Sequence, residues 1–291
     1  MSEIVRACPL CSHPKNDLFD QREFRGQPVS NRLCRKCGLV FQSPRMTSEE
    51  LNQFYESEYR RLYQGDEGPS KKDLDMQRAR AAALLSFMDG QVQSVGRHLD
   101  IGSSTGELLQ AFQKTYGSQP VGVEPGESYR RHAQTQGLKI FPSLEDLKRS
   151  NVQRFNLITI AHVLEHLPDP VAYLSNLREE ILAPVGWLLL KVPNLYAHDS
   201  FEVAHLFGFS SHTLREIVQQ AGFEVLVLKK HGAPRSQILP LYLTLLARPA
   251  SVDTPIQLRL ERLVFLKRRL GMFRRRLLSR LFPKQAWISI S

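Results

Sequence analysis

The sequence of 291 residues lacks both the long apolar runs of membrane proteins and the leader of secreted ones. No uninterrupted apolar run reaches the roughly 18 residues that a membrane-spanning helix needs. The nearest run, residues 238–247, is too short and is predicted to form a buried strand. No N-terminal segment joins a basic start to an apolar stretch, as a secretory signal does. We therefore expect a cytoplasmic protein, either soluble or attached peripherally to a membrane.

Cysteine is scarce, and its placement is informative. All four cysteines lie within the first 37 residues, as two Cys-x-x-Cys pairs: Cys8 with Cys11, and Cys34 with Cys37. A cytosolic chain seldom keeps disulfides, so this spacing indicates a tetrahedral Zn²⁺ site of the zinc-ribbon kind. Four cysteine ligands leave no open coordination position, and the predicted zinc is therefore structural.

The segment behind the cysteines predicts a short strand, a Pro-Arg turn and a helix that begins near Thr47. This helix carries Tyr55 and Tyr59, which are candidate substrate contacts, with simple packing as the equal alternative. The chain is thus predicted to have three parts. Residues 1–66 form a zinc-ribbon module plus helix, residues 73–250 the central domain, and residues 251–291 a basic tail.

A loop of small residues opens the central domain. A short strand over residues 97–99 is followed by Asp100, a turn that ends at Gly106, and a helix from Glu107. Glycines permit the sharp turn, and the helix N-terminus offers unpaired N–H groups to a polar ligand. The loop lacks the Gly-x-Gly-x-x-Gly spacing of nicotinamide-dependent enzymes, which argues against hydride transfer.

Strands and helices alternate after this loop, which predicts an α/β fold with a doubly wound parallel sheet. Glu124 ends the second strand 18 residues after Gly106, near the offset of about 20 at which an acid binds ribose hydroxyls in such folds. Ligands lie beyond the carboxyl ends of the strands. We expect Asp100, Glu124, Glu145 and His162 to meet there.

The motif Asp100-x-Gly102-x-x-x-Gly106 resembles the first motif of class I S-adenosylmethionine-dependent methyltransferases, with Ser104 where a middle glycine is usual. Residues 161–170 resemble the segment that follows the fourth strand of that family. The resemblance implies a Rossmann-like methyltransferase sheet, with Glu124 at the ribose and residues 143–146 at the adenine of the cofactor. The cofactor-binding residues it implies are Asp100, Gly102, Ser104, Gly106, Glu124, Leu144, Glu145 and His162.

The zinc module joined to this domain resembles a bacterial subgroup that modifies sugars, polysaccharides or natural products. Residues 205–210 are similar to a signature of that subgroup, although Gly208 stands where a second histidine is common. The resemblance implies a small-molecule or saccharide acceptor, either free or lipid-linked.

His205, His166 and His162 are the candidate general bases, because histidine titrates near neutral pH. His205 ranks first, since its loop faces the substrate in the resembled family. A structural role is the alternative for each of the three. Glu165 is expected to support structure, because it begins a helix where a carboxylate suits the positive end of the dipole.

The tail contains nearly all of the excess charge. Of the formal net charge of +10, +9 falls in residues 256–284, where Glu261 is the one acid. Apolar residues recur at spacings of three and four, which predicts a basic amphipathic helix over residues 256–282. Such a helix suits an anionic membrane surface at the inner face of the membrane, or packing on its own domain. Nucleic acid is disfavoured, because few aromatic residues are available for stacking and no RNA-binding module is present.

Taken together, the sequence predicts an S-adenosylmethionine-dependent methyltransferase with a structural zinc. Two alternatives stay open. One is an RNA methyltransferase that binds RNA through its zinc module and basic tail. The other is a non-catalytic scaffold with the same fold, against which the intact Asp100 loop and Glu124 argue.

Overall fold

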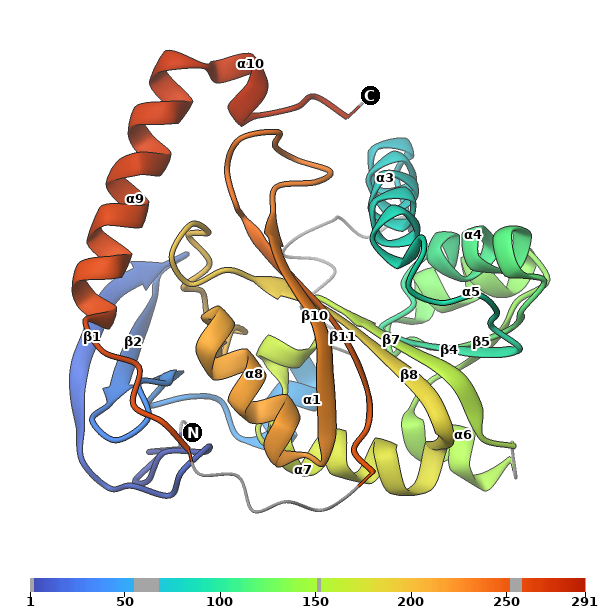
Figure 1. Ribbon diagram of the computed structural model, residues 1–291, viewed down its shortest axis with the longest axis horizontal. Coiled ribbons are helices and arrows are strands. Elements are labelled where there is room, and N and C mark those ends of the chain that lie inside the picture. The colour runs from blue at the N-terminus through green and yellow to red at the C-terminus, as the bar shows by residue number, and fades with distance from the viewer. Residues whose placement is uncertain (1–2, 55–67, 151–152, 252–257, 291) are drawn as a thin grey trace.

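A seven-stranded sheet forms the centre of the computed structural model, which describes residues 3–54, 68–150, 153–251 and 258–290 (Figure 1). The spatial order of its strands is β10 (Phe223–His231), β11 (Tyr242–Pro249), β8 (Leu182–Pro193), β7 (Phe155–Ala161), β4 (Arg97–Ile101), β5 (Gln119–Val123) and β6 (Lys139–Phe141). The pairs from β8 to β6 are parallel, and β11 is antiparallel to both of its neighbours. The doubly wound sheet is confirmed, with one antiparallel strand inserted.

Helices cover both faces of this sheet, because alternate strand residues point to opposite faces. Leu157 of β7 and Leu189 of β8 pack with α3 (Lys71–Met88) and α4 (Glu107–Tyr116). Their neighbour Ile158 packs on the other side with α7 (Pro170–Asn176) and α8 (Ser211–Gln220). Figure 1 shows α5 (Glu127–Thr135) beside α4, and α6 (Leu144–Arg149) on the side of α7. Helix α3 begins two residues before the expected start of the central domain at residue 73.

The cysteine-bearing segment builds a second, four-stranded sheet in the order β1-β2-β3-β9. Strands β1 (Asn16–Phe24) and β2 (Gln27–Cys34) form a hairpin that fills the gap between the two cysteine pairs. Strand β3 (Val40–Gln42) pairs with β9 (Phe207–Gly208), which comes from far along the chain. One buried cluster includes three of the cysteines, Phe41 and Phe207 as well as residues of the central strands, and Cys11 packs against it. The core of the N-terminal module is therefore continuous with that of the central sheet.

Helix α1 (Ser48–Gln53) follows β3, as expected, with Thr47 as its cap. The Thr47 side chain accepts from the backbone of Glu50, whose carboxylate accepts in turn from Thr47. Tyr55 and Tyr59, the predicted substrate contacts, lie outside the described residues.

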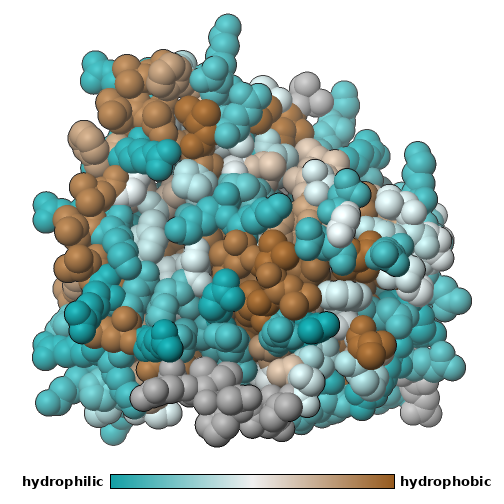
Figure 2. Space-filling model, viewed as in Figure 1, coloured by the Kyte–Doolittle hydropathy of each residue, from teal (hydrophilic) through white to brown (hydrophobic). Residues whose placement is uncertain are grey.

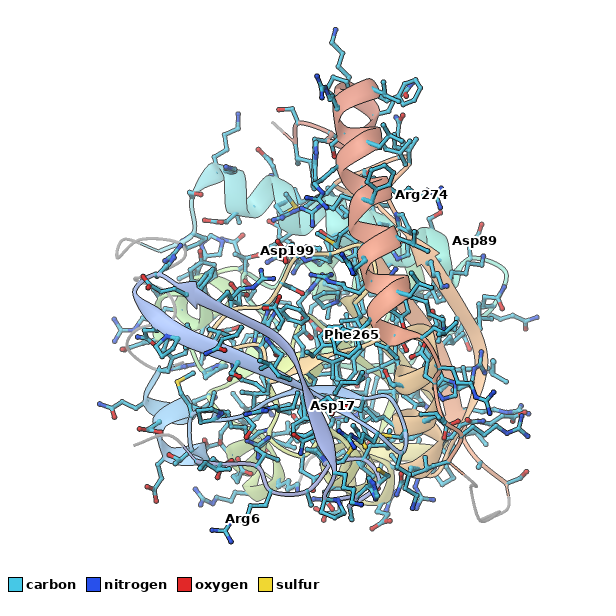
Figure 3. The ribbon with its side chains drawn as sticks, turned by 90° about the vertical axis from the view of Figure 1, so that its left-hand side faces the viewer. Arg6, Asp17, Asp89, Asp199, Phe265 and Arg274 are labelled. Atoms are coloured by element: carbon cyan, nitrogen blue, oxygen red, sulfur yellow. The ribbon has the colours of Figure 1, made fainter. Side chains whose placement is uncertain are left out.

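The basic tail forms a helix shorter than the predicted one over residues 256–282. Helix α9 runs over Val264–Leu281 and is followed by the short α10 (Pro283–Ala286). Residues 258–263 are irregular, and the Glu261 N–H donates to the Cys37 carbonyl oxygen at 3.2 Å. Figure 3 shows α9, marked by Phe265 and Arg274, on the same face as the hairpin that carries Asp17. None of the helices within the described residues is long and apolar enough to span a bilayer.

Candidate active site and metal centre

A cavity of about 600 Å³ lies beyond the carboxyl ends of β4, β5, β6 and β7. This is the expected place for a ligand in a doubly wound sheet, and the volume lies in the range of about 300–1,000 Å³ usual for ligand pockets. Of the predicted cofactor residues, the cavity is lined by Gly102, Ser104, Glu124, Leu144, Glu145 and His162. Asp100 and Gly106 belong to the same loop but are not among the lining residues.

The two glycines of the loop are required by its geometry. Gly102 has φ +74°, and a Cβ there would lie 2.5 Å from Val163 Cγ2. Gly106 has φ +81°, and a Cβ there would lie 2.3 Å from Leu138 Cδ1. Ser104, in place of the usual middle glycine, adopts φ +51°. This left-handed conformation is uncommon for a residue with a side chain, and such strain gathers at functional sites.

Glu124 joins the loop to the next strand. Its buried carboxylate accepts from the Ser104 N–H at 2.8 Å and from the Gly126 N–H at 2.9 Å. The same side chain lines the cavity. One carboxylate therefore fixes the backbone on both sides of the site and presents negative charge to a ligand.

Asp100 lies in a buried chain of hydrogen bonds beneath the loop. It accepts from the Thr159 hydroxyl at 2.6 Å, and Thr159 Oγ1 lies 2.9 Å from His98 Nε2. Burial raises the pKa of Asp100 to about 7, against the opposing effect of the Thr159 hydrogen bond. Burial also lowers the pKa of His98 to about 3, so His98 is neutral. These hydrogen bonds hold the end of β4 against β7.

His162 follows β7 directly and lines the cavity. Its φ of +59° is left-handed, and its backbone N–H donates to the Lys191 carbonyl oxygen at 2.8 Å. Its Nδ1 lies 3.5 Å from Glu165 Oε1. Its Nε2 is buried and has no hydrogen-bond partner within the described residues. Burial, reinforced by the charges of Arg80 and Lys191, lowers the pKa of His162 well below its ordinary value.

The other two histidines lie next to each other, with ring centroids 4.6 Å apart. His166 lines the cavity, and its Nδ1 donates to the Ala204 carbonyl oxygen at 2.8 Å. Burial lowers the pKa of His166 to about 3. The cavity lining does not include His205, which ranks first in the sequence analysis.

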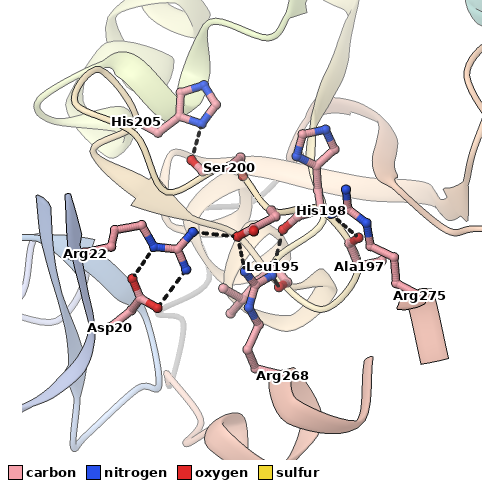
Figure 4. Close-up of polar contacts among 10 residues, drawn as sticks. Asp20, Arg22, Leu195, Ala197, His198, Ser200, His205, Arg268 and Arg275 are labelled. Carbon is pink, nitrogen blue, oxygen red and sulfur yellow. Dashed lines mark hydrogen bonds and ion pairs between the residues drawn. The ribbon is translucent and has the colours of Figure 1, made fainter. Parts of the chain in front are cut away.

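Both ring nitrogens of His205 are engaged. Its Nδ1 donates to the Ser200 carbonyl oxygen at 2.7 Å, as Figure 4 shows, and its Nε2 lies 2.8 Å from Glu202 Oε1. Burial acts to lower the pKa of His205, but the hydrogen bond and charge of Glu202 outweigh it and raise that pKa. His205 is therefore held as the cationic partner of Glu202.

Glu165, which the sequence analysis expects to support structure, lies beside His162, a residue that lines the cavity. Burial raises the pKa of Glu165 to about 7, and neither carboxylate oxygen has a hydrogen-bond partner among the residues described. The ligand atoms of Glu165, His166 and His205 lie within 4.8 Å of one another, so the three could also hold a metal ion.

Two polar residues of α3, Gln77 and Arg80, also line the cavity and were missed from the sequence. Gln77 Nε2 donates to Ser104 Oγ at 3.3 Å, next to the strained residue of the loop. Both lie on the same side of α3 as the buried Ala81, Leu84 and Met88, nearer the start of the helix. No polar stripe in the sequence marks them, so the periodicity of the helix held no signal that could have found them.

The four cysteines meet as predicted. Cys8 Sγ lies 3.5 Å from Cys37 Sγ, Cys11 Sγ lies 3.5 Å from Cys34 Sγ, and all four sulfurs lie within 4.8 Å of one another. None forms a disulfide. Sulfurs about 2.3 Å from a tetrahedral Zn²⁺ are about 3.8 Å apart, so the four thiols fit this ion. Gly38, at φ +81°, makes the turn after the second pair.

A family described as "Methyltransferase domain" matches residues 74–228, more than half of the chain. Among curated proteins, a ubiquinone biosynthesis O-methyltransferase of Coxiella burnetii (strain Dugway 5J108-111) is 32% identical over 117 residues, which cover 38% of this chain and 49% of that protein. The corresponding protein of Haemophilus ducreyi is 32% identical over 107 residues, covering 33% and 44%. The chain thus spans about half the length of the curated relatives it matches.

Solved structures show the same fold. A SAM dependent methyltransferase from Archaeoglobus fulgidus aligns with a TM-score of 0.50 at 17% identity, over 65% of this chain and 97% of that one. The 1,6-didemethyltoxoflavin-N1-methyltransferase of Burkholderia thailandensis aligns with a TM-score of 0.51 at 16% identity, over 80% and 100%. At such identities the likeness is one of fold, and it confirms the predicted Rossmann-like sheet.

Proposed function

This chain belongs to the methyltransferase domain family, and on that premise we propose that it transfers a methyl group from S-adenosylmethionine to a small-molecule or saccharide acceptor. The observation that supports this most is the cavity at the ends of four parallel strands, where Glu124 braces the left-handed loop of Gly102 and Ser104. When bound, S-adenosylmethionine supplies an electrophilic methyl group on a positively charged sulfur.

The residues of the cavity suit the parts of this cofactor. Glu124 offers a fixed carboxylate to the ribose hydroxyls, and Leu144 gives an apolar wall for the adenine, with Glu145 at its edge. Gly102 and Ser104 carry the backbone that faces the methionine portion, and Asp100 supports them from beneath. Positioning of the two reactants is the main contribution of such a site.

Within this proposal, His162 is the general base and Glu165 positions it. Glu165 Oε1 lies 3.5 Å from Nδ1 of His162, and its charge favours a proton on that nitrogen, which leaves the lone pair on Nε2 to take a proton from the acceptor. The Glu165 carboxylate then stabilises the imidazolium that forms. His205, paired with Glu202, holds the neighbouring loop.

Two likenesses support the proposed acceptor class. The curated relatives are named for O-methylation in the synthesis of a small molecule, ubiquinone. The N-terminal zinc module resembles the subgroup that modifies sugars and natural products, and a lipid-linked saccharide falls within that class.

Binding and transfer test the proposal separately. Calorimetry on the zinc-loaded protein should detect binding of S-adenosylmethionine and of S-adenosylhomocysteine. A failure to bind either would contradict the proposed cofactor. Tritiated methyl transfer into a fractionated bacterial extract should label the small-molecule or saccharide fraction. Label that disappears with ribonuclease would instead identify an RNA methyltransferase. Binding without any label would indicate a scaffold.

Two histidine variants test the base. His162→Gln should lower kcat by about 10²–10⁴-fold, the usual contribution of a general base, while the affinity for S-adenosylhomocysteine changes less than tenfold. His205→Gln should cost much less turnover. The reverse order would restore His205 as the base.

A further inference from the structure

Helix α9 is docked on the body by its polar side. Arg268 donates to the His198 carbonyl oxygen at 2.6 Å and to Asp199 Oδ1 at 3.0 Å, and Arg275 donates to the Ala197 carbonyl oxygen at 3.3 Å. Figure 4 shows both arginines reaching the loop in which these acceptors lie. Between them, a Cβ on Gly271 would lie 1.9 Å from the Tyr196 carbonyl oxygen. The approach is so close that the orientation of the helix is fixed.

The same Asp199 joins this helix to the zinc module. It also accepts from Arg22 of β1 at 2.9 Å, and Arg22 in turn binds Asp20 through two nitrogens. Phe265 of α9 packs on Phe19 of β1, with ring centroids 4.8 Å apart. The position of α9 is therefore set by the body of the protein as well as by its own sequence.

The apolar side of α9 consequently faces solvent. Five large apolar residues form one stripe at spacings of three and four, and each is 44–60% exposed: Leu266, Leu270, Phe273, Leu277 and Leu281. Figure 2 shows brown side chains along the edge of the molecule where α9 runs. This arrangement is the inverse of an ordinary surface helix, whose apolar stripe faces the core.

Positive charge borders the stripe on both sides. At about 100° per residue, Arg274 lies on one flank and Arg269, Arg276 and Arg280 lie on the other. The sequence has no acidic residue after Glu261. Glu261 itself is buried and accepts from the Tyr196 hydroxyl at 2.7 Å and from Lys267 at 3.1 Å.

We propose that this outward face of α9 lies in the interface of an anionic lipid bilayer, with the stripe among the acyl chains and the flanking arginines at the lipid phosphates. The sequence pattern left open whether the apolar side packs inward or meets a membrane, and the docking of Arg268, Gly271 and Arg275 favours the membrane. Membrane binding by α9 is a property beyond methyl transfer and can be measured without an assay of methyl transfer.

Charge decides between a bilayer and a second copy of this chain. The stripe has the three-and-four spacing of a coiled-coil seam, in which flanking residues of opposite sign stabilise the pair. Here both flanks are cationic, so two copies would bring arginines against arginines. An anionic surface neutralises them, and a basic face bordering large apolar residues is typical of helices that lie in the membrane interface.

The test is co-sedimentation of the full-length, zinc-loaded protein with vesicles. Phosphatidylcholine vesicles with about one third phosphatidylglycerol are compared with phosphatidylcholine alone. We expect binding to the anionic vesicles only, weakened at least tenfold by the triple variant Leu270→Gln, Phe273→Gln and Leu277→Gln. Because these side chains are exposed, the thermal transition should not change.

A matched control replaces Ile4 and Val185, two exposed apolar residues away from α9, with glutamine. This variant should bind vesicles like the wild type. Equal binding of the triple variant would overturn the proposal. So would a dimer in analytical ultracentrifugation that the triple variant abolishes, or RNA binding in place of vesicle binding.

Discussion

At the scale of single residues, Glu124 has two tasks that a neutral side chain cannot share. Its carboxylate accepts from two backbone N–H groups and also faces the cavity. Glu124→Gln places an NH₂ donor against one of those N–H groups. We expect the affinity for S-adenosylmethionine to fall about 10–100-fold and the free energy of unfolding to fall by about 1–3 kcal/mol, the cost of a buried unsatisfied group.

Calorimetry and thermal unfolding measure the two effects of Glu124→Gln. Glu127→Gln is the matched control, because that side chain is exposed and pairs with Arg131 on the surface. A Glu124→Gln protein that binds the cofactor like the wild type would refute the role of this carboxylate.

The pH dependence of turnover distinguishes the two histidines. The ionised form of Glu165 is the one that stabilises protonated His162, and burial raises the pKa of Glu165 to about 7. We therefore expect kcat/KM to fall as the pH drops through about 7. Glu165→Gln should lower the rate and remove this acid limb.

Glu202→Gln supplies the opposing test. Glu202 raises the pKa of His205, so its removal would shift an acid limb caused by His205 to lower pH. With His162 as the base, the limb belongs to Glu165, on which Glu202 has only the smallest of the effects on the pKa, so it should move little when kcat/KM is measured across pH 5–9. A large shift to lower pH would mean that His205 accepts the proton.

At the scale of elements, the substitution Gly271→Ala tests how α9 is docked, because docking decides whether it raises or lowers the free energy of unfolding. Glycine to alanine in a helix ordinarily stabilises by about 1 kcal/mol. Here the new Cβ would meet the Tyr196 carbonyl oxygen, so Gly271→Ala should destabilise by about 1–3 kcal/mol, as overpacking does. Denaturant unfolding measures the change, and Arg276→Ala on the exposed side should stay within about 0.5 kcal/mol. Stabilisation by Gly271→Ala would mean that α9 does not rest on this loop.

At the scale of the whole molecule, the shared core couples the zinc module to the catalytic domain. Strand β9 pairs with β3 of the module and directly follows the loop of His205. We expect about one zinc per chain, and expect its removal by a chelator to lower the unfolding temperature and abolish methyl transfer together. Restored zinc, but not magnesium, should recover both.

Cys34→Ser should reproduce the loss caused by the chelator, because Cys34 lies in the core shared by module and sheet. Metal analysis and calorimetry of the variant check this. Metal-free protein that unfolds at the same temperature and keeps its turnover would separate the module from the domain.

Much of the architecture follows from local sequence. The strands that end near Asp100, Glu124 and Ala161, and the helices between them, were predicted from periodicity and turn residues, and the doubly wound sheet is confirmed. The four thiols of the two Cys-x-x-Cys pairs lie together, as their spacing predicted. These features depend on residues near one another in the chain, whose pattern limits the backbone to few conformations. The roles assigned to the individual cofactor, substrate and catalytic residues stay predictions.

Only the tertiary structure decided which distant segments meet. The β1–β2 hairpin was not foreseen, β9 completes the sheet of the module, and α3 contributes Gln77 and Arg80 to the cavity. Among the described residues, Nε2 of His162 has no hydrogen-bond partner, whereas Nε2 of His205 lies 2.8 Å from Glu202. The tail was predicted as amphipathic, but its sequence could not tell which side faces outward. That depends on Tyr196 and Asp199, about 70 residues away, because contacts between distant segments depend on shape and charge that local periodicity does not encode.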